Sequence, residues 1–264
     1  MIKSKLSAGM VGLAIAMAAS CGAARATTFD FTSTAEGTVH GGANIESGTA
    51  GFSTKFTVGG QSVLAEAFSF GSNGAVSNAF MGQYTGGHLG LGVTDKSENG
   101  SASSHTVSNE GSQTDFIVFA LPSNSYASQI ILNGGFNGGT NADIFIGSGT
   151  GSKGTLGSLS AFAGVNIGDL TSGYGFSQVN GGGAGGEFKG TDSGNIINLS
   201  GTSDETYLIV EASNVDNSRD PDFFKLGSIT TQTAPAKVAE PASLALLGAG
   251  LAGLAFTRRR QLRG

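Results

Sequence analysis

The sequence predicts an all-β fold, an antiparallel two-sheet β-sandwich of the jelly-roll type with roughly ten strands. Three observations predict it. Short apolar or alternating segments recur between residues 27 and 230, and glycine-rich and Asn-Gly turn signals separate them. No amphipathic helix of ordinary length interrupts them. No repeat of fixed period stands out, which argues against a β-helix or a propeller.

The expected strands differ in pattern. Residues 28–32 and 52–56 alternate apolar and polar residues, as a strand with one solvated face does, and 65–70 could continue that sheet. Residues 115–120 are almost continuously apolar, which indicates a central strand. The remaining expected strands are residues 129–132, 143–146, 207–211 and 223–229. The glycine-rich stretches 147–157 and 181–190 are expected to be mobile loops.

Composition limits the function classes. The chain has 45 Gly and 17 Phe among 264 residues, enough aromatic mass for a real core. Between Asp30 and Glu240 there are 19 acidic and 7 basic residues, a net charge of −12, while both ends are basic. A surface this negative repels phosphate backbones, so we expect no nucleic-acid partner.

Residues 1–26 are typical of a secretory signal peptide. Lys3 and Lys5 form the basic start, and an apolar run expected to be helical follows. Ala24 and Ala26 place small residues at the two positions that signal peptidase reads, so cleavage is expected after Ala26. Cys21, the chain's one cysteine, also leaves a lipoprotein-type cleavage open. With either cleavage the fold must stand without disulfides.

The C-terminal end carries a second targeting pattern. We interpret residues 231–239 as a linker and 240–264 as a sorting and anchoring segment. In that segment Glu240 and Pro241 precede an apolar stretch, 244–256, which is expected to form a short hydrophobic helix. About 15 residues of helix span roughly 22 Å, less than the ~30 Å hydrocarbon core of a bilayer. The following basic cluster is expected to keep this end in the cytoplasm and so to stop transfer through the inner membrane. It consists of Arg258, Arg259 and Arg260.

Glu240-Pro241, the Leu/Ala/Gly-rich stretch and the terminal arginines resemble the PEP-CTERM sorting signal of Gram-negative bacteria that make exopolysaccharide. The usual signal begins Pro-Glu-Pro, and here Ala239 stands in place of the first proline. The resemblance implies that an exosortase recognises and cuts this end, with Glu240 and Pro241 as processing residues. It covers about 25 residues and implies nothing about the domain before them.

A second resemblance extends over the domain. Several short motifs are similar to those of exosortase-dependent surface proteins, a family defined by its sorting and by a β-rich ectodomain. It implies no catalytic residues. The motifs are Met81–Tyr84, Leu91–Val93, His105–Asn109, Thr114–Phe119, Asp143–Gly147 and Asp222–Leu226.

Residues able to carry chemistry are few. The histidines His40, His88 and His105 lack a partner at metal-ligand spacing, and no nucleophile elbow or phosphate-binding loop is present. One acidic segment offers oxygen ligands for Ca²⁺, and a solvated turn is the competing interpretation. Its candidate ligands are Asp216, Asn217, Asp220 and Asp222. Tyr84 and Tyr174 lie in glycine-rich segments and are the candidate sugar-stacking residues.

The sequence therefore predicts an exported, non-catalytic cell-surface or extracellular-matrix protein without a cofactor. Its expected partners are signal peptidase, an exosortase, the inner membrane during export, and exopolysaccharide. The alternative is a secreted carbohydrate-binding module, with calcium as a stabilising ion. An enzyme on a jelly-roll scaffold ranks third.

Overall fold

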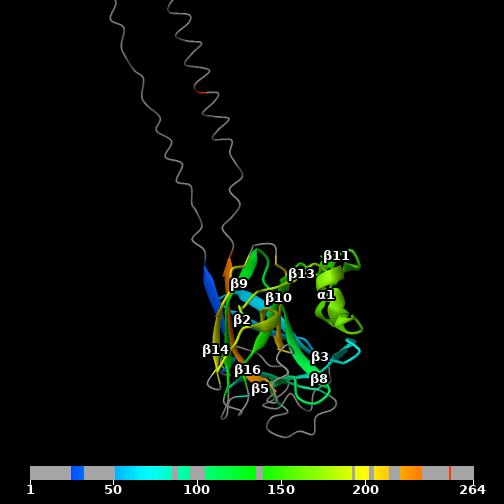
Figure 1. The fold of residues 1–264 in the computed structure, drawn as a ribbon. Helices are drawn as coiled ribbons and strands as arrows, with labels where there is room; N and C mark the ends of the chain where they lie inside the picture. Colours follow the sequence, from blue (N-terminus) through cyan, green and yellow to red (C-terminus); the bar gives the residue numbers. More distant parts are fainter. Residues whose placement is uncertain are drawn as a thin grey trace, which may run out of the picture. The chain divides into compact units, whose positions relative to one another are not determined.

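The structure is a computed structural model that describes residues 25–32, 51–84, 89–95, 105–134, 139–191, 194–201, 205–213, 221–233 and Gly250. Figure 1 shows a domain built of short strands. The strands are β1 (Ala26–Asp30), β2 (Thr54–Val58), β3 (Gln61–Gly71), β4 (Val76–Asn78), β5 (Phe80–Tyr84), β6 (Gly90–Thr94), β7 (Val107–Ser108), β8 (Gln113–Ala120), β9 (Ser125–Asn133), β10 (Ala142–Gly147), β11 (Thr150–Gly151), β12 (Gly154–Thr155), β13 (Phe176–Gln178), β14 (Asn195–Asn198), β15 (Tyr207–Ala212) and β16 (Phe223–Thr233). The helical elements are η3 (Leu159–Phe162), α1 (Ile167–Gly173) and η4 (Ala184–Gly186).

The strands form two large antiparallel sheets, which confirms the predicted all-β sandwich. The first sheet has the order β14-β9-β16-β6-β5, with β1 and β7 also paired to β16. The second has the order β13-β10-β15-β8-β3-β2, with β4 paired to β3. The eight strands expected from sequence pattern are all present, as β1, β2, β3, β8, β9, β10, β15 and β16.

The connectivity is that of a jelly roll. One four-strand path runs β1-β16-β9-β14 and the other β8-β15-β10-β13. The chain changes sheet between β8 and β9, between β9 and β10, and again at each step from β13 to β16. Sequential strands therefore face each other across the core, while strands far apart in sequence pair within a sheet. The segment from β2 to β7 is inserted between the first two strands of this scheme.

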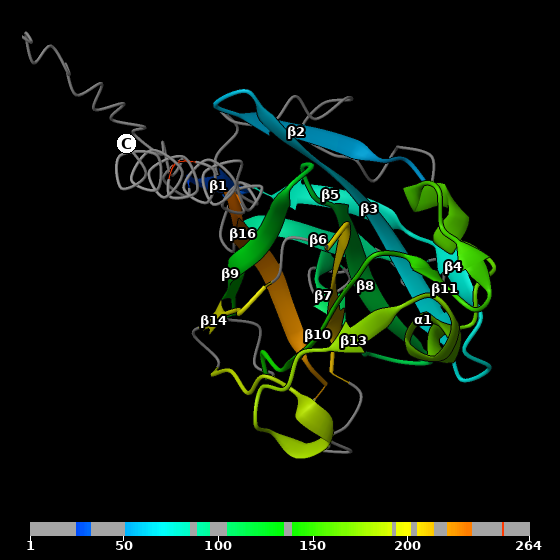
Figure 2. The same ribbon diagram turned by 90° about the horizontal axis from the view of Figure 1, so that it is seen from above.

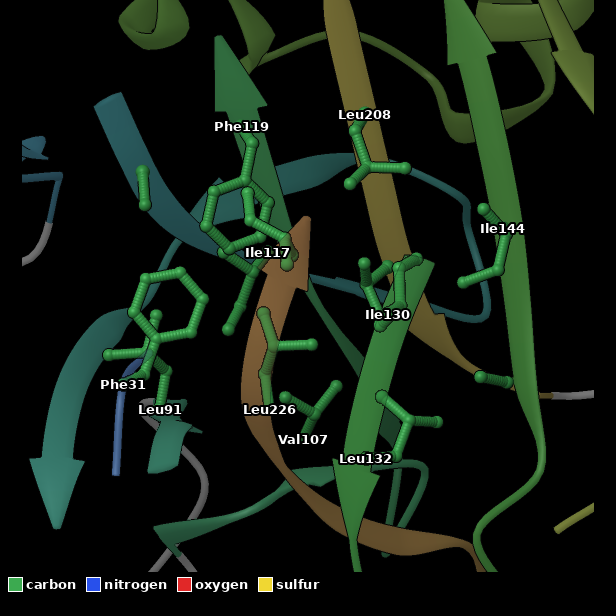
Figure 3. Packing of buried hydrophobic residues seen from close by; sticks show 14 of the residues in the cluster. Phe31, Leu91, Val107, Ile117, Phe119, Ile130, Leu132, Ile144, Leu208 and Leu226 are labelled. Carbon is green, nitrogen blue, oxygen red and sulfur yellow. The ribbon is translucent and has the colours of Figure 1, made fainter. Parts of the chain in front are cut away.

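The main core lies between the two sheets (Figure 3). Phe31 stacks on Phe119 with ring centroids 5.7 Å apart and meets Phe56 edge-on at 4.8 Å. Ile130 and Leu226 from the first sheet belong to the same cluster as Leu208 from the second, and all three are fully buried. Burying one such side chain contributes about 1.5–3 kcal/mol, so this core provides most of the sandwich's cohesion.

A second apolar cluster covers the outer face of the second sheet. Phe68, Phe116 and Ile209 point away from the main core and pack against Phe162 and Leu170. The covering residues come from the segment between β10 and β13, and Figure 2 shows its helix α1 close to the β11–β12 hairpin, where the Lys153 N–H donates to the Gly173 carbonyl oxygen at 2.9 Å. Strands β3, β8 and β15 are therefore buried on both faces, which accounts for the nearly continuous apolar run in β8.

Both glycine-rich stretches contain defined structure. Residues 147–157 hold the hairpin β11–β12, and Gly149 has φ +69° with the Tyr207 ring so close that a Cβ would lie 2.7 Å from it. Tyr207 Oη donates to the Leu156 carbonyl oxygen at 2.8 Å, which fixes the hairpin to the sheet. In residues 181–190, Phe188 pairs with Ala142 through two backbone hydrogen bonds of 2.9 and 3.0 Å.

The boundaries of the domain differ slightly from those the sequence indicated. Strand β16 continues to Thr233, so the first three residues of the expected linker, 231–239, are part of the sheet. The reason is pairing on both sides: Gln232 lies opposite Tyr126 of β9 and Ala26 of β1. Strand β1 in turn begins at Ala26, the last residue of the expected signal peptide.

Candidate functional site: the paired ends of the domain

The first and last strands of the domain lie side by side. Strand β1 pairs antiparallel with β16 over five residues, from Ala26 opposite Gln232 to Asp30 opposite Ser228. The Thr233 backbone N–H also donates to the Arg25 carbonyl oxygen at 3.0 Å. In Figure 1 the start of β1 (blue) and the end of β16 (orange) reach the same end of the domain. The first and last described residues of the domain, Arg25 and Thr233, are therefore neighbours.

Side chains on both faces hold this pair in register. Phe29 and Ile229 are opposite each other and buried in the main core. On the outer face the hydroxyls of Thr28 and Thr230 form a 2.9 Å hydrogen bond. At the end of the strand, Gln61 Nε2 of β3 donates to Thr233 Oγ1 at 3.2 Å, which links the last residue of β16 to the opposite sheet.

The sequence-predicted processing residues are only partly within the described chain. Ala26 is exposed and paired, whereas Ala24, Glu240, Pro241 and the cluster Arg258, Arg259 and Arg260 lie outside the described residues. The expected signal helix lies outside them too, and in the expected C-terminal helix only Gly250, which is helical, is described. Six residues of the sequence separate Thr233 from Glu240.

No helix within the described residues is both long and apolar enough to cross a membrane.

The candidate sugar-stacking tyrosines are already engaged by protein groups. The Tyr84 ring stacks on His105 with centroids 5.2 Å apart, and Lys225 Nζ lies 3.7 Å from the ring centroid. His105 Nδ1 also lies 3.1 Å from Thr94 Oγ1. Tyr174 ends helix α1 and packs half-buried against the second cluster. Neither ring offers an open platform of the kind sugar binding uses. His40 and His88 lie outside the described residues.

Of the candidate calcium ligands, the structure describes only Asp222. Its carboxylate is buried, and Oδ1 accepts a 3.1 Å hydrogen bond from the Asn141 backbone N–H, so this oxygen fixes a loop. The Asp222 N–H donates to Asn109 Oδ1 at 2.8 Å. Asp216, Asn217 and Asp220 lie outside the described residues. Within the described ranges, no three His, Cys, Asp or Glu side chains are grouped so that they could hold a metal ion.

Among the buried acidic side chains that the sequence did not reveal, three occupy outward-facing positions of strands in the second sheet. Asp143 and Glu211 face each other across β10 and β15, and Gln178 Nε2 donates to Asp143 Oδ1 at 2.8 Å. Burial, and then the charge of Asp143, raises the pKa of Glu211 well above its usual range. Burial also raises the pKa of the Glu66 carboxyl to about 7. The apolar residues beside them in the same strands were the signal that this face is covered.

Paired carboxyl groups are typical of general acid–base catalysis, but this pair is inaccessible. Asp143 is 4 % exposed and Glu211 5 %, so a substrate cannot reach either group in this arrangement. Glu211 Oε2 is buried without a hydrogen-bond partner, which favours the protonated, neutral form of this side chain. The protonation of this carboxyl pair therefore affects the stability of the fold, and the pair is not placed to act on a ligand.

Comparison with family models matches the PEP-CTERM protein-sorting motif to residues 238–260. The matched range contains Glu240, Pro241, the apolar stretch and the three arginines, the residues on which the sequence resemblance rested. Comparison with curated proteins and with solved structures found no match. The chain is therefore an exported protein that carries the PEP-CTERM sorting motif of exosortase substrates.

Proposed function

We propose that this chain is a non-catalytic cell-surface or extracellular-matrix protein that an exosortase processes near Glu240 and Pro241. The observation that carries the proposal is the sorting motif at residues 238–260. In this proposal signal peptidase removes residues 1–26, and the apolar C-terminal segment holds the chain in the inner membrane. Arg258, Arg259 and Arg260 remain on the cytoplasmic side. The exosortase then releases the acidic jelly-roll domain, which associates with exopolysaccharide.

The domain's chemistry supports a non-catalytic role. Its one pair of facing carboxyl groups among the described residues, Asp143 and Glu211, is buried. Its histidine within the described ranges, His105, is stacked on Tyr84. The two carboxyl groups are closed to solvent, and the half-buried His105 ring is covered on one face by Tyr84.

The processing step is tested by intact-mass analysis of exported protein from a host that has an exosortase. The wild-type chain should lack both its first 26 residues and the residues after about Pro241. The double variant Glu240→Ala, Pro241→Ala should stay at full C-terminal length in the inner-membrane fraction. Lys237→Ala, just outside the matched motif, is the control and should be processed normally. Wild-type protein recovered outside the cell with Arg258–Arg260 still attached would contradict the proposal.

The alternative function is a secreted carbohydrate-binding module. It requires an open aromatic platform, and the engagement of Tyr84 by His105 and Lys225 disfavours it. Glycan-array binding of the exported domain, with and without a chelator, separates the two proposals. Retention on a glycan that is lost with the chelator would favour the calcium-stabilised binding module. An array without signal would favour the surface protein alone.

A further inference from the structure

The peptide bond between Ala26 and Thr27 lies inside a strand of the folded domain. Ala26 pairs with Gln232 and Thr27 with Thr231, so both residues that flank the bond belong to the β1–β16 ladder. Thr231 Oγ1 additionally lies 3.4 Å from the Thr27 carbonyl oxygen and donates to it. On the carboxyl side of the bond, Phe29 is 1 % exposed in the main core. The proposed signal-peptidase site is therefore part of the sheet.

A peptidase that reads small residues at fixed positions binds its substrate as an extended strand and uses the substrate's own backbone groups. In the folded domain the backbone of β1 is already paired with β16. Moving Ala26 and Thr27 into a peptidase would require β1 to leave the sheet and Phe29 to leave the core. From this geometry we infer that signal cleavage after Ala26 is possible only before β1 docks on β16.

The order of the strands along the chain sets when docking occurs. Among the described strands β16 is the only partner of β1, and β16 is also the last strand of the domain. The first sheet cannot close until residues 223–233 have crossed the membrane, when the sorting motif at 238–260 is the next part of the chain to arrive. The β1–β16 pairing thus limits when signal cleavage can occur, because the signal peptide must be removed before the last strand is exported and pairs with β1. This inference rests on the cleavage site in the proposed function.

The test uses the full-length precursor, purified in urea and diluted into detergent micelles. In one arm purified signal peptidase is present at dilution, and in the other it is added after refolding is complete. N-terminal sequencing locates the cut. We expect cleavage after Ala26 in the first arm and resistance in the second. Phe29→Ala removes the core anchor of β1 but leaves Ala24 and Ala26 unchanged, so its refolded precursor should be cut at least roughly tenfold faster. Phe52→Ala, which removes the same ring from a position 65 % exposed and outside β1, is the control and should stay resistant.

The outcomes separate the two proposals. Equal cleavage after Ala26 in both arms would overturn the inference that β1 docking blocks cleavage, but it would still support Ala26 as the cleavage site. Cleavage at another bond, or none, in the first arm would overturn the proposed site and the inference that depends on it. Equal resistance of the refolded Phe29→Ala and wild-type precursors would show that docking of β1 is not what protects the bond.

Discussion

Glu66 offers a direct test of how burial controls stability in this domain. Its carboxyl lies in β3 opposite Val118 of β8, is 1 % exposed, and has Oε1 buried without a hydrogen-bond partner. Desolvation raises its pKa from 4.5 to about 7. The folded state therefore favours the protonated form. The stabilising contribution is complete below pH 4.5 and is lost as the pH rises through 7.

The pKa of Glu66 differs by roughly 2.5 between the unfolded and folded states, which corresponds to at most about 3.4 kcal/mol of unfolding free energy. Glu66→Gln keeps the shape and removes the titration. We expect the variant and the wild type to unfold with equal free energy at pH 4 and the variant to be more stable at pH 8. The pKa of Glu211 is raised in both proteins, so its contribution to the pH dependence cancels when the two unfolding free energies are subtracted.

The assay is urea denaturation of the exported protein at pH 4, 6 and 8, with the free energy of unfolding taken from each curve. Glu110→Gln, which changes an exposed glutamate, controls for the substitution itself. A difference between Glu66→Gln and wild type that stays constant from pH 4 to pH 8 would refute the reasoning. It would mean that the Glu66 carboxyl finds solvent or a partner in the folded state.

Two further predictions concern packing. Phe119→Ala empties a fully buried position beside Phe31 and should lower the free energy of unfolding by about 3–5 kcal/mol. Phe52→Ala, at a position 65 % exposed, should change it by less than about 0.5 kcal/mol, and similar losses from both in urea denaturation would be inconsistent with the core assigned here. Gly92→Ala places a Cβ 1.8 Å from the His105 carbonyl oxygen and should lower Tm markedly, whereas Gly157→Ala meets no atom within 4 Å and should not. Equal Tm values for the two glycine variants would show that the 105–106 backbone does not cross β6 as the structure has it.

The strands could be predicted from sequence because their patterns are local. Residues 115–120 and 207–211 are apolar enough to indicate central strands, and β8 and β15 are indeed neighbours in the middle of the second sheet. The outer apolar cluster could not be predicted in the same way. Leu159, Phe162 and Leu170 are spaced irregularly among glycines and serines, so no period marks them. Their partners on β3, β8 and β15 become visible only when strand register is known.

In the candidate site, too, contiguous features could be predicted from the sequence and features that depend on strand pairing could not. The sorting motif is a contiguous segment, so Glu240, Pro241 and the arginines could be identified directly. The adjacency of Ala26 and Gln232 depends on a pairing between residues 206 positions apart, which no local pattern encodes. The buried acids could not be recognised either, since the sequence of a strand does not reveal which of its polar positions another segment of the chain will cover.

The central place of β16 has a consequence for a domain held by its C-terminal end. Tension on that end acts along the β16 axis, because Thr233 is its last residue. On one side β16 is paired with β9 from Lys225 to Thr233, and on the other with β1 from Ser228 to Gln232. Extracting the strand would require both ladders to slide at once, with their hydrogen bonds loaded together. If the chain were instead held by an edge strand and pulled perpendicular to that strand, the hydrogen bonds of the edge strand would break one after another. The strand that completes the sheet is thus also the one best placed to resist pulling while the chain is held at the membrane.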